Sequence, residues 1–223
     1  CISGKDSMKN DAIINGEKIS IPPTLLFSLI GNHKDVRKAV SSDFKQKGDH
    51  IFLLGETHQE LGASEISFMM QAENSGGIGG KVPQINPTRN LTLYKALIDA
   101  MDSKLVRSAH DCSEGGLSVA LAESCFGVAT GCNVDISLLF DSDNRLDKWG
   151  ALFGESLGRI LVSTSSEDSE LFKQTMQGHS CIYLGEVGNE DTIEISAHGN
   201  TLLKSDWKTL NNTWKATLDG GGP

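Results

Sequence analysis

The sequence predicts an α/β (α+β) protein in which helices cover a mixed sheet. Short apolar runs that are typical of strands alternate with segments whose apolar residues recur at helical spacing. The alternation is irregular, which favours a mixed sheet over a purely parallel one. The 223 residues are 38% apolar and 22% charged, an ordinary globular composition in a chain long enough to bury a core.

Residues 1–35 are predicted to be a remnant of a preceding domain. A polar loop over residues 3–10 precedes two strand-like runs, residues 19–21 and 25–30, which a pair of prolines separates. Two strands without a helix to cover them cannot bury both of their faces. We therefore expect the rest of their sheet to be missing or to come from another domain.

Residues 36–215 are predicted to form the main domain, followed by a flexible glycine-rich tail at residues 216–223. The glycine-rich residues 74–80 are predicted to form a mobile loop. Periodicity and turn residues define the remaining elements. The expected strands are at residues 51–54, 105–109, 132–136, 159–163, 181–187 and 192–196, and the expected helices at residues 63–71, 88–103, 113–125, 149–156 and 167–176.

Charge and cysteine usage indicate a soluble cytoplasmic protein. The formal net charge is −9 and no dense Lys/Arg run occurs, which disfavours nucleic-acid binding. The apolar runs are too short to span a membrane, and no secretory signal is apparent. The five cysteines are scattered without metal-ligand spacing, so we expect free thiols rather than a disulfide frame or a zinc site. Because the sequence begins at Cys1, we expect it to be part of a longer protein.

The most informative segment runs from Ser108 to Gly116, where a carboxylate and a hydroxyl lie between a strand end and a helix start. Backbone N–H groups and the helix dipole attract anions at such a turn, which makes it a candidate phosphate site. Asp111 is a hard oxygen ligand suited to Mg²⁺, and Ser113 is a donor to a phosphate oxygen. The alternative is that Asp111 or Ser113 caps the helix while the glycines permit close packing.

Two further pairs of residues near this segment have more than one interpretation. His110 and Cys112 have the side chains of a base and a nucleophile, but a buried structural cysteine is the interpretation that we favour. Glu155 and Arg159 are four residues apart around a helix-to-strand turn. They either pair structurally or face a cleft.

Three other polar segments give weaker signals. Residues 4–7 superficially resemble a phosphate loop but lack the upstream glycine spacing, so a solvent-facing turn is the alternative. Residues 62–65 are a candidate anion cradle or, equally, a helix cap. His58 has no second histidine at metal-ligand spacing, and we expect it on the surface.

Four segments in the same order resemble the carboxy-terminal half of the phosphoribosylformylglycinamidine synthase family. The resemblance spans roughly residues 1–196, and the third segment is the most specific. The segments are Ser3-Gly4-Lys5-Asp6-Ser7-Met8, Leu61-Gly62-Ala63-Ser64-Glu65, Ser108-Ala109-His110-Asp111-Cys112-Ser113-Glu114-Gly115-Gly116-Leu117 and Leu152-Phe153-Gly154-Glu155-Ser156-Leu157-Gly158-Arg159.

This resemblance implies a fold and an activity. The family belongs with aminoimidazole ribonucleotide synthetase and selenophosphate synthetase, and pairs an amino-terminal sheet domain with a carboxy-terminal α/β domain, twice in the synthase. Its reaction converts formylglycinamide ribonucleotide to the amidine in purine biosynthesis, with ATP as the activating group and ammonia from glutamine as the nucleophile. The family's catalytic histidine lies in the first half, so the chain is expected to be inactive alone.

The resemblance also implies site residues, cofactors and partners. Asp111 matches a Mg²⁺-binding aspartate and Ser113 a nucleotide-contacting serine, with the amides of Gly115 and Gly116 beside them; the cofactors are ATP or ADP and Mg²⁺. Loop residues Gly4, Lys5 and Ser7 match positions near the nucleotide or substrate. Lys5 replaces an asparagine metal ligand of short bacterial forms, and because a cation cannot ligate Mg²⁺, only a phosphate contact is expected there. The implied partners are the missing amino-terminal domains and a glutaminase domain or subunit.

Two competing functions accompany this reading. One is a scaffold domain that holds the enzyme together by pseudo-symmetric packing and binds no nucleotide. The other is a different member of the same superfamily, such as an aminoimidazole ribonucleotide or selenophosphate synthetase.

Overall fold

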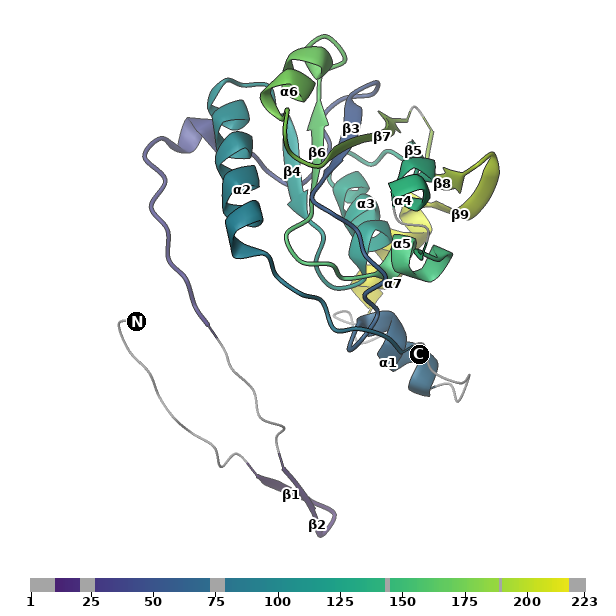
Figure 1. The fold of residues 1–223 in the computed structure, drawn as a ribbon. Helices are drawn as coiled ribbons and strands as arrows, with labels where there is room; N and C mark the ends of the chain where they lie inside the picture. Colours follow the sequence, from purple (N-terminus) through teal and green to yellow (C-terminus); the bar gives the residue numbers. More distant parts are fainter. Residues whose placement is uncertain (1–10, 21–26, 73–78, 143–144, 189, 217–223) are drawn as a thin grey trace. The chain divides into compact units, whose positions relative to one another are not determined.

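The structure is a computed structural model that describes residues 11–20, 27–72, 79–142, 145–188 and 190–216. Its contacts divide the chain into two units, Cys1–Val36 and Arg37–Pro223. Figure 1 shows the ribbon with its helices and strands labelled. The assignment of residues 1–35 to a preceding domain remains a prediction.

The first unit contains a small antiparallel hairpin of β1 (Ala12–Ile14) and β2 (Glu17–Ile19). Asn15 and Gly16 connect the strands with positive φ angles of 51° and 84°, the Asn-Gly turn that matches strand twist. Every residue of both strands is exposed. The predicted strand at residues 25–30 is wrong for its described part, since residues 27–30 are exposed and irregular.

The second unit is built on a sheet that contains seven of the described strands, in the order β4-β6-β3-β7-β5-β8-β9. Neighbours pair antiparallel except β5 and β8, which are parallel, so the predicted mixed sheet is confirmed. The strands are β3 (His50–Leu54), β4 (Ser108–Asp111), β5 (Cys132–Asp135), β6 (Ile160–Thr164), β7 (Cys181–Val187), β8 (Thr192–Ala197) and β9 (Asn200–Asp206).

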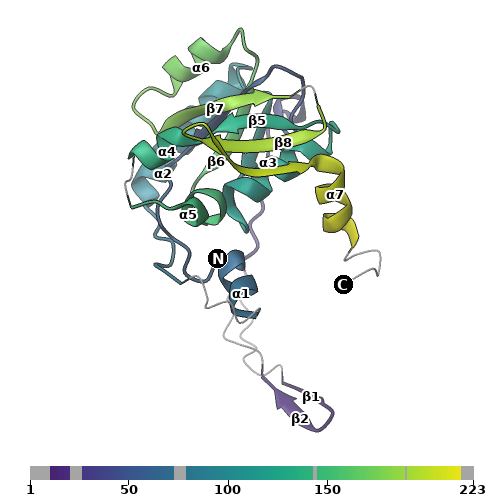
Figure 2. The ribbon, with the colours of Figure 1, turned by 90° about the vertical axis from the view of Figure 1, so that its right-hand side faces the viewer.

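Helices cover this sheet, as the sequence predicts, and they lie on both of its faces. Helices α2 and α6 lie on one face, and α3, α5 and α7 pack on the other (Figures 1 and 2). The helices are α1 (Glu65–Ala72), α2 (Pro87–Asp102), α3 (Gly116–Phe126), α4 (Ser137–Ser142), α5 (Lys148–Phe153), α6 (Ser169–Thr175) and α7 (Trp207–Ala216), with a short 3-10 helix at Val36–Lys38.

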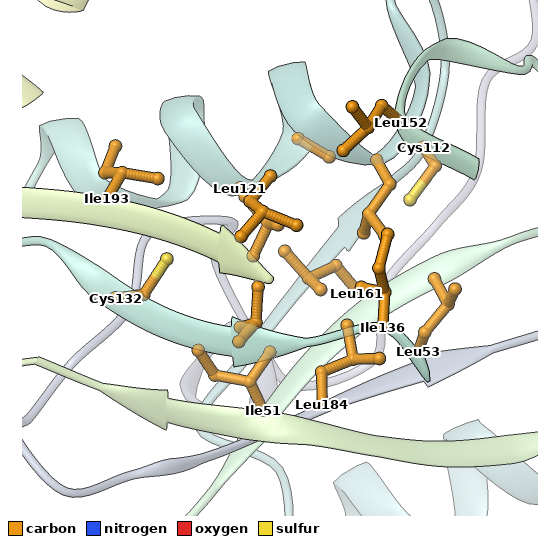
Figure 3. Packing of buried hydrophobic residues seen from close by; sticks show 14 of the residues in the cluster. Ile51, Leu53, Cys112, Leu121, Cys132, Ile136, Leu152, Leu161, Leu184 and Ile193 are labelled. Atoms are coloured by element: carbon orange, nitrogen blue, oxygen red, sulfur yellow. The ribbon is translucent and has the colours of Figure 1, made fainter. Parts of the chain in front are cut away.

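Strand β3, in the interior of the sheet, shows why the core has two halves. Ile51 and Leu53 point into the cluster under α3, whereas Phe52 and Leu54 point into the cluster under α2. All four are fully buried, because successive strand side chains alternate between faces that are both covered. Figure 3 shows Ile51 and Leu53 among the residues of the first cluster.

Several element boundaries differ from the predictions. The strand expected at residues 105–109 occupies Ser108–Asp111 instead, because Leu105 lies in the capping turn that follows α2: its N–H donates to the Ala100 carbonyl at 3.0 Å, and Lys104 has φ 62°. This is the left-handed helix ending of a Schellman motif. The helix expected to reach Ser156 ends at Phe153, since Gly154 is extended.

Besides β1 in the first unit, the sequence predictions missed α4, β9 and α7 in the second unit. Strand β9 follows a tight turn at His198 and Gly199, both with positive φ, and pairs with β8. Helix α7 then starts where the Asp206 carboxylate accepts the Thr209 N–H at 2.8 Å, an N-cap. Figure 2 shows α7 directly after β9.

Candidate functional site

The turn between β4 and α3 has a backbone that only glycine adopts without strain. Gly115 and Gly116 have φ angles of 76° and 64°, the left-handed region. A Cβ on Gly115 would meet Val119 Cγ2 at 2.3 Å, and one on Gly116 would meet the Gly154 carbonyl oxygen at 2.5 Å. The second contact means that the end of α5 lies directly against the first residue of α3.

Asp111 and Ser113 are exposed on this turn. The Asp111 side chain is 77% exposed, and its carboxylate accepts a hydrogen bond from the Ser113 hydroxyl. That hydrogen bond holds the pKa of Asp111 below the ordinary value for an aspartate. The carboxylate is therefore anionic at neutral pH and has open space around it.

A cleft of about 420 Å³ adjoins these two residues, within the size range of small-molecule sites. It combines three carboxylates, from Asp111, Glu114 and Glu155, with apolar walls. A cleft of this charge attracts cations, so a phosphate would enter it together with a metal ion. The lining residues are Pro83, Tyr94, Asp111, Cys112, Ser113, Glu114, Glu155, Leu157, Gly158, Arg159 and Ile160.

The two glycine amides donate hydrogen bonds inside the protein. The Gly115 N–H donates to Glu155 Oε1 at 2.9 Å, and the Gly116 N–H donates to the Ser113 carbonyl at 3.0 Å. Neither Asp111 nor Ser113 caps α3, whose N-cap residue Gly115 has no side-chain cap. The capping alternative is therefore wrong for these two side chains, because the accepting carboxylate comes from another part of the chain.

Glu155 is one of the residues whose roles the sequence left open, and it connects two helix starts. Its Oε1 also accepts the Glu65 N–H at 3.0 Å, at the first residue of α1. Its own N–H donates to the Glu60 carbonyl at 3.3 Å. In the sequence, Glu155 is marked only by the glycine before it, which ends a helical pattern. Nothing nearby in the sequence indicates which backbone amides donate to its carboxylate.

Arg159 lies beneath this connection and is 1% exposed. Its Nε donates to the Ser156 carbonyl at 3.2 Å, another nitrogen donates to the Gly154 carbonyl, and a third donates to Thr57 Oγ1 at 3.2 Å. Burial lowers the pKa of this arginine. The guanidinium thus holds the residues on both sides of Glu155 through their carbonyls, and Arg159 also belongs to the lining of the cleft.

His110 and Cys112 do not form a nucleophile and base pair. Cys112 is 6% exposed and packs in the core (Figure 3), and burial raises the pKa of its thiol. His110 Nε2 lies 3.2 Å from Glu123 Oε2, and its Nδ1 lies 2.8 Å from the Asp111 carbonyl oxygen. The prediction that Cys112 is buried is confirmed.

Of the remaining residues in the predicted polar segments, some lie in the described part of the chain and others do not. Gly4, Lys5 and Ser7 lie outside the described residues, so their predicted role stays a prediction. Ser64 is fully buried, and its Oγ donates to the Leu61 carbonyl at 2.8 Å. His58 is a partly exposed neighbour of Glu56, 3.3 Å away.

No metal site with three protein ligands is preformed in the described part of the chain. No group of three or more His, Cys, Asp or Glu side chains could hold a metal ion there, and the four described cysteines are free thiols. None of the described helices combines the length and apolar character that crossing a membrane requires.

A second, smaller pocket of about 160 Å³ lies beside the first turn of α2 and was not predicted. Glu60 lines it and is 6% exposed; its Oε1 accepts the Gln84 N–H at 3.1 Å, whereas its Oε2 is buried without a hydrogen bond.

The fold is similar to that of several solved proteins. Thermotoga maritima PurL complexed with FGAR matches with a TM-score of 0.66 and 18% identity, over 78% of this chain and 29% of PurL. PurL from the same organism complexed with ATP matches with a TM-score of 0.60 and 20% identity, over 78% and 27%. Escherichia coli HypE, a hydrogenase maturation protein, matches with a TM-score of 0.51 and 14% identity, over 75% and 51%.

The matched part is less than a third of the length of the PurL chains. A sequence model described as "AIR synthase related protein, C-terminal domain" matches residues 46–215, a range that contains the sheet, its helices and the turn with Asp111. The chain therefore belongs to the AIR synthase related protein family, of which residues 46–215 form the C-terminal domain.

Proposed function

We propose that this chain is the carboxy-terminal part of a phosphoribosylformylglycinamidine synthase. In that role it belongs to an ATP-dependent carbon-nitrogen ligase of purine biosynthesis, with glutamine as the amide donor and a cytoplasmic location. Membership of the AIR synthase related family and the similarity to PurL structures complexed with ATP and with FGAR support the proposal. The four sequence segments that resemble this synthase family favour it over other members.

Within that enzyme, we assign to the turn after β4 the binding of a magnesium nucleotide. The observation that carries the proposal is the position of the Asp111 carboxylate, exposed and hydrogen-bonded to Ser113 at the start of a helix and beside a cleft. Mg²⁺ is commonly held by one or two carboxylates together with phosphate oxygens and waters. A site in which Asp111 is the single protein ligand, without further preformed ligands, is consistent with this coordination of Mg²⁺.

Each group of the turn has a separate task in this proposal. Asp111 supplies the metal ligand, and the exposed Ser113 hydroxyl is the donor to a phosphate oxygen. Mg²⁺ would neutralise phosphate charge, which the acidic cleft alone would repel. Lys5, which lies outside the described residues, is a separate proposal: a phosphate contact at its own loop and not at this turn.

The chain is proposed to be inactive by itself, because the remaining domains supply the catalytic histidine and the glutaminase. The test uses the complete parent enzyme and assays amidine formation from formylglycinamide ribonucleotide with ATP and either glutamine or ammonia. We expect activity with both nitrogen donors and none from this chain alone. Lack of activity in the complete enzyme would remove the synthase proposal.

Nucleotide binding is tested separately by titration calorimetry of the full-length protein with ADP and Mg²⁺. We expect Asp111→Asn to weaken binding at this site by about 10- to 100-fold, the typical cost of a disturbed metal site. Omission of Mg²⁺ should have a similar effect on the wild type and little further effect on the variant.

A scaffold role without nucleotide is the second candidate, and one observation favours it. The amides of Gly115 and Gly116, which an anion would use, already donate to Glu155 and to the Ser113 carbonyl. If the domain is only a scaffold, the calorimetric isotherm of Asp111→Asn will equal that of the wild type.

A further inference from the structure

Glu155 occupies a central position between three segments that the chain brings together. Its Oε1 accepts N–H groups from Gly115, 40 residues away, and from Glu65, 90 residues away. Charge-assisted bonds from a carboxylate to backbone N–H groups are among the stronger hydrogen bonds in proteins. One oxygen therefore fixes the distance between the start of α1 and the turn that carries Asp111.

The loop that carries Glu155 is itself held from below. Arg159, fully buried, donates to the carbonyls of Gly154 and Ser156, the two neighbours of Glu155. The close approach of Gly154 to Gly116 leaves no room for the loop to move towards α3. The backbone of Glu155 is thus fixed. Its carboxylate therefore holds the N–H groups of Gly115 and Glu65 in place through its two hydrogen bonds.

We propose that Glu155 is a positioning residue for the magnesium nucleotide site, acting through the Gly115 amide on the turn of Asp111 and Ser113. This inference rests on the proposed nucleotide function. Asp111 and Ser113 bond to each other, whereas Glu155 is the group from outside that ties down the amide at the end of their turn. Without that tie the turn has more conformational freedom, and ordering it again lowers the affinity for the ligand.

Two substitutions separate the reach of the side chain from its charge. Glu155→Gln keeps the length and an oxygen that accepts both N–H groups, but removes the charge. Glu155→Asp keeps the charge but is one methylene too short to meet both amides. We expect Glu155→Asp to weaken Mg²⁺·ADP binding by about 10-fold or more, and Glu155→Gln to retain most of the wild-type affinity.

The experiment uses the full-length protein, with calorimetry for binding and thermal unfolding to confirm that each variant is folded at the assay temperature. Exposed Glu167, just before α6, provides the matched controls Glu167→Asp and Glu167→Gln, which should bind as the wild type does. Amide hydrogen exchange gives a second readout: Gly115 and Glu65 should exchange faster in Glu155→Asp than in Glu155→Gln.

Three results would overturn the inference. Unchanged affinity in Glu155→Asp would leave Glu155 a folding role only. Tighter binding in either variant would mean that the carboxylate competes with the ligand for the amides. A larger loss in Glu155→Gln than in Glu155→Asp would mean that the charge acts directly on the ligand.

If the proposed nucleotide function itself is wrong, the binding experiments will give results that differ from these three. In that case the wild type itself shows no Mg²⁺·ADP binding, or Asp111→Asn binds as the wild type does. Both the nucleotide site and its positioning by Glu155 would then be rejected, whatever the exchange rates show.

Discussion

The hydroxyl of Ser113 donates a hydrogen bond to the carboxylate of Asp111 across one intervening residue. Because this bond favours the charged form, it lowers the pKa of Asp111. Any stabilisation from the bond is therefore present above the ordinary carboxyl pKa of about 3.9 and is lost as the pH falls through the lowered value.

The same relationship gives a titration experiment. We expect Ser113→Ala to raise the pKa of Asp111 towards the ordinary value, measured by the carboxyl ¹³C shift. An internal control exists, since Ser137 donates to Asp135 and lowers the pKa of that residue in the same way. Ser113→Ala should leave Asp135 unchanged, and Ser137→Ala should leave Asp111 unchanged; a shift of both residues in either variant would contradict a local cause.

The close approach at Gly116 predicts a loss of stability. Gly116→Ala and Gly178→Ala both place alanine at a positive φ, 64° and 89°, at a cost of about 1–2 kcal/mol. Only the Gly116 methyl collides with backbone, at Gly154, whereas the Gly178 methyl meets open space. We expect Gly116→Ala to lower the free energy of unfolding by about 1–3 kcal/mol more than Gly178→Ala does, measured by urea unfolding. Equal losses in the two variants would contradict the contact with Gly154.

Buried Arg159 predicts one of the largest single-residue effects in the domain. Arg159→Ala leaves the carbonyls of Gly154 and Ser156 without their donor, and removes a charge from a position that is 1% exposed. Removing one partner from a buried charged network typically costs about 3–5 kcal/mol. The control Lys95→Ala, at an exposed position on α2, should change the free energy of unfolding by no more than about 0.5 kcal/mol. Similar values for both variants in chemical denaturation would show that the network contributes little.

The described cysteines predict a slow reaction with thiol reagents in the native state. Burial raises the pKa of Cys112, and that of Cys181 to about 12. A hydrogen bond with Cys132, and then burial, raise the pKa of Cys125. Since the thiolate is the reactive form, we expect little reaction with a disulfide reagent at pH 8 until a denaturant is added.

The same shifts have a defined sign for stability. The unfolded chain ionises its thiols near the ordinary cysteine pKa of about 8.5, whereas the folded chain keeps these protons. The folded state therefore loses stability as the pH rises above that value. The thiol-labelling experiment should use the Cys1→Ser variant, because Cys1 lies outside the described residues. Fast labelling of Cys112, Cys125 or Cys132 in the native protein would contradict their burial.

The elements that the sequence predicted well carry their own periodic pattern. Strand β3 is a continuous apolar run because both of its faces are covered, and α2 and α3 repeat apolar residues at helical spacing. The missed helix α7 does carry such a pattern, with Trp207 and Leu210 packed against the core, whereas the missed strand β9 lacks one. In β9 no residue is buried, so its alternation is weak, and its place in the sheet depends on the turn before it.

For the candidate site, the chain's own residues determined the turn itself: two adjacent glycines, an acid and an alcohol between a strand and a helix. Only the tertiary structure decided what bonds to that turn. The carboxylate that accepts the Gly115 amide belongs to Glu155, 40 residues away, and residues this far apart are brought together by the packing of α5 against α3. Local spacing specifies backbone conformation, whereas the partner of a buried donor depends on which distant segment the folded core places next to it.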